Sequence, residues 1–186
     1  MQYLTLKWQG LLDMSYSIAL GCSHTSGTGV ESHEAWPSLL NVDKNLGKNG
    51  ASTDYCARIL RDYLRHTHVD IVYIFYPNRF RFEHVVDGNI EQSVPSDPGR
   101  INLMETYDDA WCEANYNKQT ATIYGLCIQH NCLLVDLTLE NITTIIDHND
   151  RWPIGSDNLH NGPQWHVWLA DLFRVRKCYK EYEKTR

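Results

Sequence analysis

Short, continuously apolar runs are separated along this chain by segments with helical periodicity. The strongest run is Val69–Phe75, and Ser17–Gly21 and Cys132–Leu137 are shorter runs of the same kind. Such runs, apolar at nearly every position, indicate strands that are buried on both faces, as in a parallel sheet. A weaker run at Leu40–Leu46 predicts one more short strand.

The helical segments have recognisable starts. Ser52 is expected to cap a helix that reaches about His66, because apolar residues recur after it at three- and four-residue spacing. Pro163 suits the first turn of a last helix, and the stretch from 101 to about 130 is expected to be mostly helical. Glu31–Leu40 predicts a short helix.

The remaining long segment, Phe80–Arg100, carries two prolines and two glycines and is expected to be a loop. Strands that alternate with helices predict an α/β protein with a parallel sheet of about five strands, covered by helices on both faces. We expect one domain over residues 14–186, with residues 1–13 as an N-terminal extension.

The composition of the chain argues against two classes of partner, nucleic acids and membranes. The formal charge of the 186-residue chain is −6, which argues against general nucleic-acid binding. No apolar run approaches the roughly 20 residues of a membrane-spanning helix, and the N-terminus lacks the pattern of a secretory signal. We therefore expect a cytoplasmic protein with neither a nucleic-acid nor a membrane partner; the oligomeric state is left open.

Six scattered cysteines, with no Cys-x-x-Cys pair, are expected to be reduced thiols. His66 and His68 form the only close pair of metal-binding type, and they fall at a predicted helix end. We expect no metal and no cofactor.

Three segments follow predicted strands, at the sheet edge where parallel sheets bind ligands: Gly21–Gly29, Gly47–Ser52 and Pro77–Arg79. The first presents Ser23 directly after a strand. Near the last helix, Asp157 precedes His160 by three residues, so one tight loop can orient an imidazole. A serine, a histidine and an orienting carboxylate are the parts of a serine hydrolase.

The blocks Gly21-Cys-Ser-His-Thr25, Asn45-Leu-Gly-Lys-Asn-Gly-Ala-Ser-Thr53 and Asp157-Asn-Leu-His-Asn-Gly-Pro163, in this order, resemble those of the SGNH (GDSL-type) hydrolases. The resemblance extends from about Ser17 to about Phe173. It implies a flavodoxin-like, three-layer α/β/α sandwich, which the order of predicted elements also suggests, and an esterase activity without a cofactor.

The resemblance also implies roles. Ser23 would be the nucleophile, His160 the general base and Asp157 the residue that orients it. The backbone N–H groups of Ser23 and Gly50 would form the oxyanion hole, with the side-chain amide of Asn78 as third donor.

Two positions depart from the family pattern. Cys22 stands where the family has Asp; a cysteine nucleophile is the alternative, although neighbouring side chains on extended backbone point in opposite directions. The family's Gly-x-Asn-Asp block is absent, and Asn78 stands without the flanking Gly and Asp. Asn78 is therefore either a donor or an ordinary turn residue. His24 is expected to be an exposed turn histidine, and Trp152 and Trp165 to be core residues.

The leading hypothesis is a serine esterase that acts on a small-molecule or carbohydrate ester with a short acyl group, such as an O-acetyl sugar. An acyltransferase would use the same residues. A catalytically silent domain that binds a saccharide or a protein is the alternative from another class. A flavodoxin-like cofactor binder is disfavoured, because it would have no use for Asp157 and His160.

Overall fold

A parallel four-stranded sheet forms the centre of the computed structural model, which describes residues 15–93, 108–139, 154–157 and 159–185. Its strands are β1 (Ser17–Gly21), β2 (Lys44–Asn45), β3 (Ile71–Phe75) and β6 (Leu133–Leu137), in the order β2-β1-β3-β6. All three pairings are parallel, as the apolar runs predicted. The described residues contribute four strands to this sheet, one fewer than expected.

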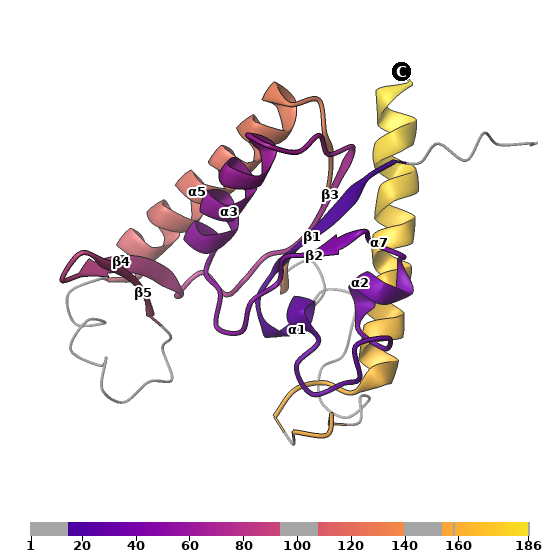
Figure 1. Ribbon diagram of the computed structural model, residues 1–186, viewed down its shortest axis with the longest axis horizontal. Coiled ribbons are helices and arrows are strands. Elements are labelled where there is room, and N and C mark those ends of the chain that lie inside the picture. The colour runs from indigo at the N-terminus through magenta and orange to yellow at the C-terminus, as the bar shows by residue number, and fades with distance from the viewer. Residues whose placement is uncertain (1–14, 94–107, 140–153, 158, 186) are drawn as a thin grey trace, which may run out of the picture.

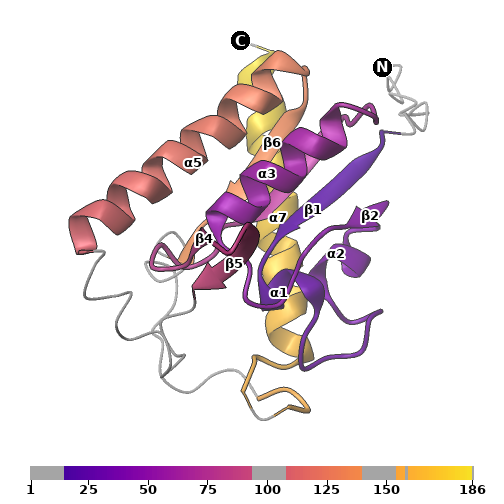
Figure 2. The same cartoon turned by 60° about the vertical axis from the view of Figure 1, so that its left-hand side comes forward.

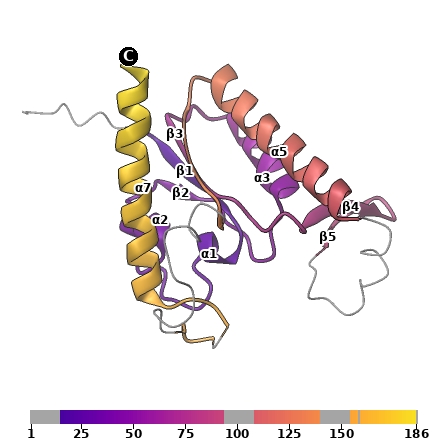
Figure 3. The ribbon, with the colours of Figure 1, turned by 180° about the vertical axis from the view of Figure 1, so that it is seen from behind.

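Helices cover both faces of the sheet and make three layers (Figure 1). Helices α3 (Thr53–Leu64) and α5 (Asp109–Gln129) lie on one face, and the short α2 (Trp36–Leu39) and the long α7 (Pro163–Lys184) lie on the other (Figure 3). A single-turn helix, α1 (Ser23–Ser26), follows β1 directly. The predicted α/β/α sandwich is therefore confirmed. Among the helices that the structure describes, none has both the length and the apolar composition to span a bilayer.

The period-two geometry of the strands divides the core in two. One set of strand side chains packs under α3 and α5, where Leu60 and Ile123 are fully buried. The alternate set packs under α2 and α7 around Trp36 and Phe173, whose rings stack with centroids 4.4 Å apart. Both side chains are fully buried. These two cores fix the strand ends on which the site is built.

Several helix boundaries follow from local signals. Ser52 caps α3, and its hydroxyl accepts the Tyr55 N–H at 3.2 Å, as predicted. Pro163 begins α7, also as predicted. Within Glu31–Leu40, only Trp36–Leu39 is helical, because Pro37 can occupy the first turn of a helix but not its interior.

The segment expected to be a loop, Phe80–Arg100, contains an antiparallel hairpin, so that prediction was wrong. Strands β4 (Phe82–Val86) and β5 (Asn89–Ser93) pair across a turn with positive φ at Asp87 and Gly88, the conformation that two-residue hairpin loops require. The hairpin lies beyond the ends of α3 and α5 (Figure 2). The last part of the Phe80–Arg100 segment, residues 94–100, lies outside the described residues, as does 101–107 of the predicted helical stretch.

His166, in the first turn of α7, links that helix to α2 in the core around Trp36 and Phe173. Its side chain is fully buried, and its Nδ1 accepts the backbone N–H of Trp36 at 3.2 Å. Burial lowers the pKa of His166 from 6.5 to about 4. Since an acceptor nitrogen must carry no proton, this contact requires a neutral imidazole.

We predict that His166 makes stability depend on pH. The unfolded chain takes up a proton at His166 near pH 6.5 and the folded chain only near pH 4, so stability is complete above about 6.5 and falls as the pH is lowered toward 4. At about 1.4 kcal/mol per pKa unit, the loss is on the order of 2 to 3 kcal/mol. Urea unfolding of the wild type and of His166→Asn at several pH values measures it.

His166→Asn is the matched variant, because the amide oxygen of asparagine can still accept the Trp36 N–H but does not titrate. Its stability should fall less between pH 6.5 and 4 than that of the wild type. Equal losses in the two proteins would show that His166 does not carry the effect.

Candidate active site

Ser23 lies where β1 passes into α1, at the carboxyl edge of the sheet. The turn before it is tight: Gly21 has φ +150°, and a Cβ at this position would lie 2.1 Å from Thr25 Oγ1 and 2.7 Å from the Phe75 carbonyl oxygen. Only glycine fits there. The sequence of the turn therefore places the Ser23 side chain, which is buried at the floor of the site.

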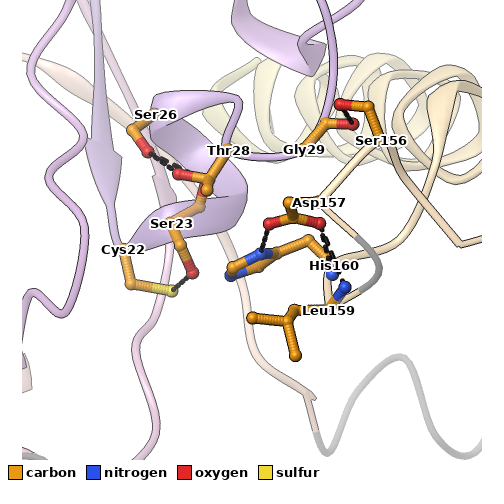
Figure 4. Close-up of polar contacts among 9 residues, drawn as sticks. All are labelled: Cys22, Ser23, Ser26, Thr28, Gly29, Ser156, Asp157, Leu159 and His160. Atoms are coloured by element: carbon orange, nitrogen blue, oxygen red, sulfur yellow. Dashed lines mark hydrogen bonds and ion pairs between the residues drawn. The ribbon is translucent and has the colours of Figure 1, made fainter.

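Asp157 and His160 form a compact loop in front of α7. The Asp157 carboxylate accepts the backbone N–H groups of Leu159 (3.1 Å) and His160 (3.0 Å) through Oδ1, and its Oδ2 lies 2.5 Å from Nδ1 of His160. The nitrogen left free, Nε2, is on the side of the ring that points toward Ser23 (Figure 4). The sequence spacing of three residues thus gives the expected contact between carboxylate and imidazole.

This loop is held against the segment that follows the serine turn. The Gly29 carbonyl oxygen accepts both the N–H (2.8 Å) and the hydroxyl (3.1 Å) of Ser156. A Cβ at Gly29 would lie 2.7 Å from Asp157 Oδ1 and 3.1 Å from His160 Cβ, and one at Gly155 would lie 2.4 Å from the Gly29 oxygen. Two glycines therefore allow the close approach that brings residues 157 and 160 to Ser23.

The hydrogen bonds to Asp157 keep it ionised. The backbone N–H of His160, then the His160 side chain and the Leu159 N–H, lower the pKa of Asp157 to about 2. The carboxylate is therefore charged at any pH near neutrality, and it can support an imidazolium if His160 takes up a proton.

The three side chains do not form a continuous hydrogen-bonded chain. Within the described part of the structure, the one side-chain contact of the Ser23 hydroxyl is with Cys22 Sγ at 4.0 Å, and no hydrogen bond joins it to His160. Contacts between nucleophile and base are often long in sites without substrate. Cys22 is buried, and so is Ser23. The 4.0 Å contact places its Sγ beside the Ser23 hydroxyl, so the two side chains do not point in opposite directions as expected (Figure 4).

Gly50 reaches the same edge through a loop that is tied to the serine turn. The Lys48 N–H donates to the Gly21 carbonyl at 3.1 Å, and Ala51 N–H donates to the Lys48 carbonyl at 3.0 Å. Gly50 is third in this four-residue turn and has φ +72°. Its own N–H takes no part in the closing bond of such a turn, and it donates to no backbone carbonyl among the described residues.

Asn78 follows β3 and is exposed, with its Oδ1 accepting the Phe80 N–H at 2.9 Å. This contact is that of a turn residue. It engages the oxygen of the amide only, and the NH₂ group, which an oxyanion would need, has no acceptor among the described residues. This geometry is compatible with Asn78 as an oxyanion donor and with Asn78 as an ordinary turn residue. Substitution of Asn78 distinguishes the two roles.

A pocket of about 260 Å³ opens beside Asn78, between the ends of β3 and β6. Aromatic and aliphatic side chains make up most of its lining, with one arginine and one threonine: Tyr76, Pro77, Asn78, Arg79, Phe80, Tyr116, Thr138 and Leu139. The volume is below that of most sites for drug-sized ligands, roughly 300 to 1,000 Å³.

His24 was expected to be exposed, and this prediction was wrong. It is half-buried, and its ring lies 5.5 Å from that of His160 and 4.7 Å from that of Trp165. Trp165 is buried, as expected of a core residue, while Trp152 lies outside the described residues. Nothing in the local sequence signals the His24 contact, because its partners are more than 130 positions away in the chain.

The described residues contain no group of three or more His, Cys, Asp or Glu side chains that could hold a metal ion. All six cysteines are free thiols, five of them buried and Cys178 exposed.

No protein-family model and no curated protein matches this chain. Similar solved structures include one named TesA (12% identity, TM-score 0.47, covering 87% of this chain and 97% of that one). Others are a lipase/acylhydrolase from Enterococcus faecalis (19%, 0.45, 88% and 96%) and a member of the lipolytic protein G-D-S-L family from Veillonella parvula (16%, 0.38, 91% and 97%). These names include the family that the sequence motifs resemble. At such identities and TM-scores, an activity has to be argued from the residues themselves.

We predict that Gly29→Ala displaces Asp157 and His160. A methyl group at this position meets Asp157 Oδ1 at 2.7 Å, so the loop must shift. The proton on Nδ1 of a histidine hydrogen-bonded to a carboxylate gives a far-downfield NMR resonance, which should be present in the wild type and be lost or shifted in Gly29→Ala.

Gly88→Ala is the matched control, since Gly88 has a similar φ (+80° against +89°) but nothing within 4 Å of its added Cβ. Both variants bear the cost of a left-handed alanine, roughly 1 to 2 kcal/mol. If the resonance changes equally in both, backbone strain rather than contact with Asp157 is responsible.

Proposed function

We propose that this protein is a serine esterase that uses Ser23, His160 and Asp157. One observation carries the proposal: the His160 ring lies between the Ser23 side chain and the Asp157 carboxylate, with Nδ1 2.5 Å from Oδ2 and Nε2 on the side toward Ser23 (Figure 4). Structural packing alone does not require a serine, a histidine and a carboxylate to meet at the carboxyl edge of a parallel sheet, where ligands bind.

In the proposed reaction, Ser23 Oγ attacks the ester carbonyl while His160 Nε2 accepts its proton. Asp157 holds Nδ1–H and stabilises the imidazolium that forms. The tetrahedral intermediate collapses as His160 gives the proton to the leaving alcohol, which leaves an acyl group on Ser23. His160 then accepts a proton from a water molecule as that water attacks the acyl carbonyl. It returns the proton to Ser23 Oγ as the bond from the acyl carbon to Oγ breaks, which releases the acid and restores the free enzyme.

Negative charge on the tetrahedral oxygen would be met by N–H donors from three turns. Ser23 is the first residue of α1, so its N–H has no carbonyl partner within the helix. The Gly50 N–H and the Asn78 amide complete the proposed oxyanion hole. The support for this set is that the turns after β1, β2 and β3 meet at one edge.

The proposed substrate has a short acyl group, as in an O-acetyl carbohydrate. The support for a short acyl group is the small pocket of about 260 Å³ that opens beside Asn78, the proposed third oxyanion donor; Ser23, His160 and Asp157 do not line it. Activity toward a series of p-nitrophenyl esters should fall as the acyl chain lengthens.

Ser23→Ala should abolish both ester hydrolysis and labelling by a fluorophosphonate probe. Its free energy of unfolding should stay within about 1 kcal/mol of the wild type, since the one side-chain hydrogen bond of the hydroxyl to a described residue is the long one to Cys22 Sγ at 4.0 Å. Cys22→Ala is the control and should still be labelled at Ser23 when the modified peptide is mapped. Labelling that persists in Ser23→Ala and is lost in Cys22→Ala would assign the nucleophile to the cysteine.

Asn78→Asp separates the two interpretations of Asn78. The carboxylate can still accept the Phe80 N–H and preserve the turn, but it cannot donate to an oxyanion and repels it. Turnover should fall about a hundred- to thousandfold with little change in Michaelis constant, because the contact strengthens only in the transition state. Asn78→Ala should lose about as much. Turnover within about threefold of the wild type in both variants would make Asn78 a turn residue.

A further inference from the structure

His24 occupies a place in the site to which neither the triad nor the oxyanion hole assigns a role. Its ring meets the His160 ring nearly edge-on, with centroids 5.5 Å apart and planes at 79°. It also lies 4.7 Å from the Trp165 ring and 6.0 Å from the Phe75 ring. Its Nδ1 is buried and has no hydrogen-bond partner among the described residues. The contacts of this ring are therefore those of packing.

Asp157 alone leaves the His160 ring incompletely fixed. Its bond to Nδ1 opposes rotation of the ring about the Cβ–Cγ bond. A hydrogen bond tolerates a range of lengths and angles, however, and the torsion about the Cβ–Cγ bond has broad minima. A small rotation about that bond would move Nε2 away from Ser23. A second contact on the flank of the ring removes this freedom, and the edge-on contact with His24 is such a contact.

His24 is itself held firmly. Phe75, at the end of β3, and Trp165, in the first turn of α7, are both buried and also lie against each other at 5.8 Å. His24 is the residue after Ser23, and Trp165 comes five residues after His160. This cluster of edge-on and tilted rings therefore fixes the nucleophile turn and the base relative to each other.

The lack of charge on His24 at neutral pH suits its position beside His160. Burial, followed by the nearby His160, His166 and Arg81, lowers the pKa of His24 to about 4, while Asp157 acts in the opposite direction. His24 is therefore uncharged at neutral pH. A cation at this distance would oppose the protonated His160 that forms during the reaction.

We propose that His24 is a positioning residue: its ring holds the His160 imidazole in the orientation in which Nε2 faces Ser23. This inference rests on the proposed function. The role depends on a flat ring in contact with His160. It does not depend on an imidazole nitrogen, because the contact is one of ring on ring and His24 is uncharged at neutral pH.

The test compares His24→Ala, His24→Phe and His24→Leu, with turnover, Michaelis constant and the rate of fluorophosphonate labelling as readouts. His24→Ala should lower turnover and labelling about tenfold with the Michaelis constant within about twofold of the wild type. His24→Phe, which keeps a flat ring, should recover most of the loss, and His24→Leu should lie between them. His24→Leu and His24→Phe carry the comparison if the cavity in His24→Ala prevents folding.

A double-mutant cycle distinguishes positioning from general support of the fold. Combined with His160→Ala, the His24→Ala change should lower the labelling rate no further, because the residue it acts through is gone. The inference is overturned if His24→Ala slows labelling tenfold in both backgrounds, or if His24→Phe is as impaired as His24→Ala. Failure of the wild type to be labelled at Ser23 would instead overturn the proposed function.

Discussion

The candidate site depends on one contact between two turns, in which the Gly29 carbonyl oxygen accepts the N–H and the hydroxyl of Ser156. Residue 29 belongs to the segment that presents the serine, and residue 156 to the loop that carries the histidine and the carboxylate. The two segments are 127 positions apart in the chain. Without this contact, Asp157 and His160 would still form their local pair, but no other backbone hydrogen bond among the described residues ties their loop to the segment after the serine turn.

The sheet and the helices that cover it hold the two segments of that contact in fixed positions. Both faces of β1 and β3 are buried, so a one-residue slip in register would turn each row of side chains toward the opposite core and disrupt the packing of both. Their carboxyl ends, and the turns that follow them, are therefore fixed to each other. On the other side, α7 is fixed by the stack of Trp36 on Phe173 and by the bond from the Trp36 N–H to His166. The base loop precedes that helix directly, so the core behind the site determines where the base lies.

The features that could be predicted from the sequence are those that depend on residues close together in the chain. Ser17–Gly21, the Ser52 cap and the start of α7 at Pro163 were predictable because each depends on a few neighbouring residues. The pairing of Asp157 with His160 was predictable for the same reason. The hairpin of β4 and β5 was missed because prolines and glycines dominate Phe80–Arg100, while its hairpin signal is limited to Asp87-Gly88 and the residues that flank it. His24 was missed because its environment comes from Trp165 and His160, which only the folded chain brings near it.

The central claim is that Ser23 becomes acylated during turnover, and the acyl-enzyme can be trapped. The protein is mixed with p-nitrophenyl acetate, quenched in acid within the first turnovers and mapped by peptide mass spectrometry, while released p-nitrophenolate is followed in parallel. The account predicts a burst of about one p-nitrophenolate per protein and an acetyl group on Ser23, both absent in His160→Ala. Acetyl on another residue, or turnover without any acetylated peptide, would contradict it.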